Sequence, residues 1–121
     1  MQIADYFASH ILEGTWQTDE KVPSVRQLAV DLEVNPNTVL RAYAYLQDTE
    51  IIYNKRGMGF YVGEKAQEIL KTQLKERFFK DELPEIFKTM YLLDVNCNEI
   101  DELYLQWSNQ NKSNTKNNEK N

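Results

Sequence analysis

A chain of 121 residues, of which 41% are hydrophobic, can form one compact domain with a small helical appendage but not two large cores. The net charge of −5 argues against indiscriminate binding of polyanions, so any surface that binds nucleic acid must be positive locally. No run approaches the roughly 18 apolar residues of a membrane helix, and one cysteine with one histidine cannot build the common metal clusters, so we expect a cytoplasmic protein without a metal or cofactor.

The chain begins with a predicted amphipathic helix over residues 2–13. Ile3, Phe7 and Ile11 lie four residues apart, which places them on one helical face. Gly14 follows and favours the end of this helix.

Two further short helices are predicted, joined by a tight turn. Ser24 and Gln27 have the spacing of a capping box, in which each side chain satisfies a backbone donor at the start of a helix from about Val25 to Leu32. Asn35 and Pro36 form a second helix start, because asparagine caps exposed N–H groups and proline at the first helical position loses no hydrogen bond. The two helices make a helix-turn-helix pattern.

The pattern then changes to strands. Residues 51–53 and 60–62 are rich in β-branched and aromatic side chains and flank a glycine-containing turn, which predicts a two-stranded wing. Helices are expected from about Ala66 onward, with Pro84 breaking one or starting the next.

The predicted fold class is α+β, mainly α. Residues 1–63 form a winged helix-turn-helix, residues 64–107 a C-terminal helical dimerisation module, and residues 108–121 a polar tail that is too hydrophilic to order itself.

The third helix offers a face for duplex DNA. Val39 and Tyr43 belong to its apolar stripe, which leaves Asn37, Leu40 and Arg41 on the opposite face, where the second helix of such a motif enters the major groove. Asparagine can read adenine, arginine can grip guanine, and a leucine can touch a thymine methyl. Leu40 at the edge of the domain core is the alternative.

Three blocks of sequence, in order, resemble the GntR family, and specifically its short YtrA-type branch. They read VPSVRQLA at 22–29, VNPNTVLRAY at 34–43 and YNKRGMGFYV at 53–62. The resemblance covers roughly residues 1–63 and implies a transcription regulator that represses its own operon by binding a palindromic operator as a homodimer. Glu33 and Glu50 depart from it, because the branch usually has glycine at these positions.

The resemblance implies a DNA contact for Arg26, beside Ser24, whereas a surface salt bridge to Asp31 or Glu33 is the alternative. At the wing tip, cations can reach a phosphate or the minor groove, and glycines allow a tight turn or a close approach to a phosphate. The full set of candidate DNA-binding residues is Ser24, Arg26, Asn35, Pro36, Asn37, Thr38, Leu40, Arg41, Lys55, Arg56, Gly57, Met58 and Gly59.

The C-terminal helices carry more apolar surface than a small appendage can bury against itself, which predicts a two-fold partner. A pocket for an apolar effector is the alternative, and a small-molecule effector is possible but unidentified. The candidate dimerisation residues are Ile69, Leu70, Leu74, Phe78, Ile86, Phe87, Met90, Leu93, Leu103 and Trp107.

Two other functions are a protein-binding module and an enzyme. A winged helix that binds proteins suits an acidic chain, but the amide and cationic side chains of the third helix and wing favour DNA. An enzyme is not expected, since no nucleophile has a base partner in the pattern.

Overall fold

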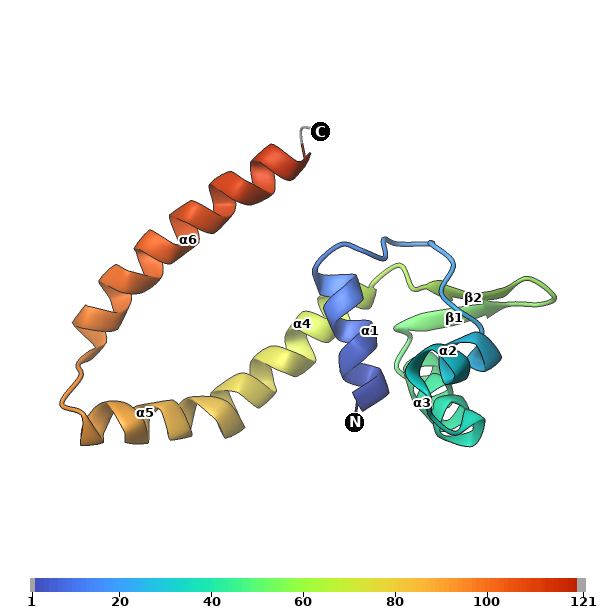
Figure 1. The fold of residues 1–121 in the computed structure, drawn as a ribbon, viewed down its shortest axis with the longest axis horizontal. Helices are drawn as coiled ribbons and strands as arrows, with labels where there is room; N and C mark the ends of the chain where they lie inside the picture. The colour runs from blue at the N-terminus through green and yellow to red at the C-terminus, as the bar shows by residue number, and fades with distance from the viewer. Residues whose placement is uncertain (1, 120–121) are drawn as a thin grey trace. The chain divides into compact units, whose positions relative to one another are not determined.

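The computed structural model describes the backbone of residues 2–119 and the side chains of residues 3–112. It confirms the predicted fold class: a mainly helical chain with a two-stranded antiparallel wing (Figure 1). The elements are α1 (Gln2–Leu12), α2 (Val25–Leu32), α3 (Pro36–Asp48), β1 (Ile52–Lys55), β2 (Gly59–Val62), α4 (Ala66–Arg77), the π-helical turn η1 (Phe78–Glu82), α5 (Leu83–Leu92) and α6 (Cys97–Glu119). The chain divides into an N-terminal unit, residues 1–76, and a C-terminal unit, residues 77–121.

The core of the N-terminal unit forms where α3 packs against α1, α2 and β1. The apolar stripes predicted for α1 and α3 are buried. Tyr43 lies at the centre of this core, because its ring meets Phe7 of α1 edge-on at 5.3 Å and Phe60 of β2 edge-on at 5.1 Å. Burial raises the pKa of Tyr43 far above its ordinary value, so this phenol remains uncharged.

Capping residues fix the starts of α2 and α3. The Ser24 hydroxyl accepts from the Gln27 amide at 3.1 Å, and the Asn35 side chain accepts from the Asn37 amide at 2.8 Å. The predicted box at α2 is only half formed, because the Gln27 side chain donates to Asp31 at 2.7 Å instead of returning to the cap. Asp31 lies one helical turn further along α2 and offers a charged acceptor on the same face.

Glu33 and Glu50 adopt the left-handed backbone conformation that usually favours glycine. Glu33, which ends α2, has φ 54° and ψ 45°, and Glu50, which follows α3, has φ 64°. The left-handed region costs an L-residue roughly 1–2 kcal/mol. Both turns therefore keep a left-handed residue without glycine, at some cost in stability.

The wing is longer and its turn tighter than the sequence predicts. β1 and β2 pair from Ile52 with Val62 to Lys55 with Gly59, leaving a three-residue connection. Gly57 has φ 78°, a conformation that lets the chain reverse close to the last paired residues.

Helix α4 begins in the N-terminal unit, which extends to Glu76 rather than ending at Gly63. Leu70, only 4% exposed, belongs to the core, and Ile69 and Leu74 pack against it. The Gln67 side chain also donates to the carbonyl of Ile11 at 3.1 Å, which ties α4 to α1. Leu70, predicted as a dimer contact, is thus buried in the core of the single chain, whereas Ile69 and Leu74 are half-buried and stay predicted dimer contacts.

The C-terminal unit follows the sequence prediction at Pro84 and differs from it at the end of the chain. The chain passes from α4 through η1 into α5 as helical turns, and Pro84 lies in the first turn of α5, so it starts a helix as predicted. Helix α6 runs to Glu119 and so covers most of residues 108–121, where we expected disorder; residues 120–121 lie outside the described part.

Helix α6 has a strong start that the sequence analysis did not use. The Asn96 amide donates to the Glu99 carboxylate at 2.9 Å, and the Glu99 amide donates to the Asn96 side chain at 3.0 Å, which is a reciprocal capping box. Once a helix is nucleated, each added residue gains one backbone hydrogen bond, so polar residues can prolong it.

Candidate nucleic-acid interface

The exposed face of α3 presents the side chains that the sequence predicts for base reading. Asn37, Leu40 and Arg41 are exposed, while Val39 between them is fully buried. Leu40 is 57% exposed, so the alternative that it belongs to the domain core is wrong. The exposed Leu40 lies between the Asn37 amide and the Arg41 guanidinium. Such a surface suits the major groove of DNA, where base edges offer both hydrogen-bonding groups and thymine methyl groups.

The start of α3 is exposed as well. Asn35, Pro36 and Thr38 lie at the surface around the first turn, where the Thr38 amide donates to the Asn35 carbonyl at 3.0 Å. This helix end favours an anion through the positive end of its dipole. The Asn35 side chain is partly committed, since its oxygen caps the Asn37 amide.

Arg26 is exposed in the first turn of α2, directly after the cap residue Ser24. Within residues 2–119 it makes no ion pair with Asp31 or Glu33, so the surface salt bridge considered above does not form. Asp31 accepts instead from Gln27. Arg26 is therefore available to an external anion.

The wing tip carries exposed cations on a turn held by a hydrogen bond of 2.8 Å from the Met58 amide to the Lys55 carbonyl. Lys55 and Arg56 are exposed, Met58 is 59% exposed, and the Lys55 ammonium lies 4.6 Å from the centre of the Tyr61 ring. This cation–π contact holds the Lys55 side chain over the sheet without neutralising its charge. The tip therefore combines positive charge with a tight backbone turn.

The glycines of the wing have distinct tasks. Gly57 is open to solvent and needs its positive φ for the turn. Gly59 has φ 110°, and a Cβ there would lie 3.1 Å from the Cε of Lys21. Lys21 thus lies beside the wing, because its backbone pairs with Tyr61 of β2. Lys21 and Tyr61 are far apart in the sequence, so local patterns do not predict this position.

The hydrogen bond to Asp19 raises the pKa of Tyr53 above its ordinary value, with burial a smaller cause. The hydroxyl donates to the Asp19 carboxylate at 2.8 Å, which ties the loop after α1 to β1. The aromatic rings of Tyr53 and Tyr61 stack with centres 5.8 Å apart. The two tyrosines therefore link the loop after α1 to both strands of the wing.

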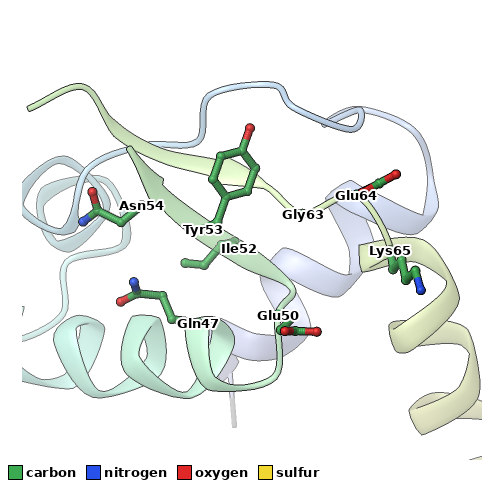
Figure 2. Close-up of a pocket in the computed structure, with 8 residues that line it drawn as sticks. All are labelled: Gln47, Glu50, Ile52, Tyr53, Asn54, Gly63, Glu64 and Lys65. Atoms are coloured by element: carbon green, nitrogen blue, oxygen red, sulfur yellow. The ribbon is translucent and has the colours of Figure 1, made fainter. Parts of the chain in front are cut away.

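A separate open cavity of about 550 Å³ lies between the end of α3, β1 and the start of α4 (Figure 2). Its lining consists of Gln47, Glu50, Ile52, Tyr53, Asn54, Gly63, Glu64 and Lys65. None of the candidate DNA-binding residues lines it. Within the described residues, no three His, Cys, Asp or Glu side chains are grouped as a metal site would require, and no helix is long and apolar enough to span a bilayer.

Comparison with known proteins identifies this arrangement. The family model described as "Bacterial regulatory proteins, gntR family" matches residues 1–62. In Bacillus subtilis, the "HTH-type transcriptional repressor YtrA" is 33% identical over 84% of this chain and 77% of its own length. The HTH-type transcriptional regulator YhcF of the same organism is 31% identical over 83% of this chain and 81% of its own length.

Solved structures agree with the sequence relatives. A GntR-family regulator from Bacteroides thetaiotaomicron is 40% identical with a TM-score of 0.69, covering 90% of this chain and 95% of its own. A GntR-family regulator from Listeria monocytogenes is 37% identical with a TM-score of 0.68, covering 90% of each chain. The chain thus belongs to the GntR family of bacterial regulatory proteins and is a DNA-binding transcription regulator, not an enzyme.

Proposed function

We propose that this GntR regulator binds a palindromic operator as a homodimer and represses its own operon. The observation that carries the proposal is the uncovered apolar surface of the C-terminal unit. Within residues 77–112 the helices leave these side chains open to solvent, and a second copy would bury them. Repression is supported by the relative that is named a transcriptional repressor.

The reading surface is assigned to the exposed face of α3. Asn37, Leu40 and Arg41 contact base edges in the major groove, with Arg41 gripping a guanine through two parallel hydrogen bonds. The first turn of α3 and Arg26 at the start of α2 hold backbone phosphates, which fixes the register of the protein on the duplex. The wing tip supplies further phosphate contacts through Lys55 and Arg56.

The dimer surface is assigned to α5 and α6. Among residues 77–112, no side chain is buried, although both helices are rich in large apolar residues. Leu103 and Trp107, one turn apart on α6, are 62% and 61% exposed, and Phe87 on α5 is 50% exposed. Burial gives about 25 cal/mol for each Å² of apolar surface removed from water, so leaving such faces in solvent forgoes several kcal/mol.

The remaining predicted dimer residues fit this surface. Phe78, Ile86 and Leu93 are exposed and Met90 is half-buried within the single chain. A two-fold partner that covers these residues also places two copies of α3 on two half-sites about one helical turn of DNA apart. Tethering two weak contacts in this way raises the overall affinity without a new contact.

The test is a gel-shift with the DNA upstream of the gene for this protein. The double variant Phe87→Asp with Leu103→Asp should become monomeric in light scattering at micromolar concentration and bind the fragment at least tenfold more weakly. The control, Asn98→Asp with Asn109→Asp, adds the same charge at positions that helical spacing places on the face of α6 away from Leu103. Equal behaviour of the two double variants would contradict the proposed dimer surface.

A further inference from the structure

Lys21 lies on an extra strand-like edge of the wing. The segment that leads into α2 pairs with β2: Lys21 lies opposite Tyr61 in an antiparallel bridge. Hydrogen bonds of 2.9 Å flank this bridge, from the Val22 amide to the Phe60 carbonyl and from the Val62 amide to the Glu20 carbonyl. The wing therefore has a third edge segment that begins far from it in the sequence.

The pairing places two lysines on one face of the sheet. Directly opposite residues, and residues two apart on a strand, share a face. Lys21 is opposite Tyr61, and Lys55 is opposite Gly59, two residues before Tyr61. Lys21 and Lys55 thus lie on the outer face, while Val62 on the other face is buried in the core.

The two lysine side chains extend over β2 at different residues, Lys21 beside Gly59 and Lys55 over Tyr61. The Lys55 ammonium lies 4.6 Å from the Tyr61 ring centre, and a Cβ on Gly59 would lie 3.1 Å from Lys21 Cε and 3.8 Å from Lys21 Nζ. Because Gly59 has no side chain, the Lys21 side chain can approach the backbone of β2 at this residue. The Lys55 ammonium lies over Tyr61, the next residue of β2 on the same face, so the outer face carries two cations.

No acidic side chain neutralises this pair. Neither Lys21 nor Lys55 makes an ion pair within the described part of the chain. Asp19, on the same edge segment as Lys21, accepts a hydrogen bond from the Tyr53 hydroxyl. Two unpaired cations on one exposed face favour binding of an anion there, and a DNA phosphate is the anion that a DNA-binding protein meets.

We propose that Lys21 contacts a backbone phosphate of the operator and extends the phosphate-binding surface of Lys55 across the outer face of the wing. The contact raises the affinity for DNA and helps to fix the position of the protein along the duplex. It gives no base specificity, because phosphates carry no sequence information. This assignment rests on the proposed phosphate contact of the wing and extends it to a residue outside the helix-turn-helix and the wing strands.

The experiment measures operator binding by fluorescence anisotropy over a range of salt concentrations, using full-length Lys21→Ala, Lys55→Ala and Lys71→Ala. Each phosphate contact contributes about 0.9 to the slope of log K against log salt concentration. Lys21→Ala and Lys55→Ala should each flatten the slope by about that amount. Lys71, exposed on α4, is the control for a net charge change of the same size.

Two further measurements separate a phosphate contact from a structural effect. Lys21→Arg should keep the wild-type slope, because the cation is retained. Lys21→Ala should leave the thermal midpoint unchanged, since its pairing with β2 uses backbone groups.

The outcomes distinguish the two assignments. A flattened slope for Lys55→Ala with an unchanged slope for Lys21→Ala overturns the role of Lys21 and leaves the wing contact standing. Unchanged slopes for both variants overturn both. A slope for Lys71→Ala that falls as much as that for Lys21→Ala also overturns the Lys21 contact, because the effect would then be one of net charge.

Discussion

The hydroxyl of Tyr43 on α3 donates a hydrogen bond of 2.6 Å to the backbone carbonyl of Pro23, the residue that precedes the cap of α2. The bond joins the proposed reading helix to the entry of the other helix of the motif. The Tyr43 ring also packs against Phe7 of α1 and Phe60 of β2, so one side chain links the helix-turn-helix to α1 and to the wing.

Removing this hydroxyl should destabilise the protein. Tyr43→Phe keeps the ring contacts but leaves the Pro23 carbonyl without its partner, which should lower the free energy of unfolding by about 1–2 kcal/mol in urea titration. Tyr53→Phe is the control, because its hydroxyl bonds to an exposed carboxylate that water can satisfy. Equal losses in the two variants would show that the Tyr43 bond has no special weight.

Glycine should stabilise the two turns where glutamate adopts a left-handed backbone. Glu33→Gly and Glu50→Gly relieve the cost of positive φ, partly offset by the greater freedom of glycine in the unfolded chain, for a gain of about 1 kcal/mol each. Glu68→Gly, within α4, should instead lose about 1 kcal/mol. The prediction is wrong if Glu33→Gly and Glu50→Gly both lower the thermal midpoint.

Gly63 is required for a close approach of two backbone segments. A Cβ at this position would clash with the carbonyl oxygen of Glu50, a backbone atom that cannot rotate away (Figure 2 shows both residues). Gly63→Ala should therefore cost about 2 kcal/mol or more. Gly14→Ala has open space and only the strain of its φ of 85°, so it should cost about 1 kcal/mol. A smaller loss at Gly63 than at Gly14 would contradict the steric account.

Arg41 should carry sequence preference. Arg41→Ala should weaken binding to the cognate operator by about 1–3 kcal/mol and relax the preference at one base pair in each half-site, as loss of a two-bond contact to a guanine would. The measurement is a competition assay against operators with single base-pair changes. Equal weakening on all sequences would assign Arg41 to the phosphate backbone.

Local patterns in the sequence predicted the helix-turn-helix well. The caps at Ser24 and Asn35 and the apolar stripe of α3 depend on residues within one or two helical turns, so they can be read directly from spacing. The exposure of Leu40 follows from the same stripe, although sequence alone left it undecided.

Features that depend on distant contacts were not predictable in the same way. The burial of Leu70 depends on core surface formed by elements earlier in the chain, from α1 to the wing, and the position of Lys21 depends on pairing with β2. The polar composition of residues 108–119 predicts disorder, whereas the structure shows a helix there. The capping box of Asn96 and Glu99, which starts this helix, lies outside that polar segment. Periodicity identified the apolar residues of the C-terminal helices, but it does not predict which of them are buried in the N-terminal core.

The most direct test of the account is the mass of the protein–DNA complex. Sedimentation equilibrium of the intact chain with a duplex containing the palindromic operator should give two chains for each duplex. The free protein should be a dimer at micromolar concentration, and a duplex with a single half-site should bind far more weakly. One chain on each operator, or equal affinity for the palindrome and the half-site, would contradict the dimeric regulator proposed here.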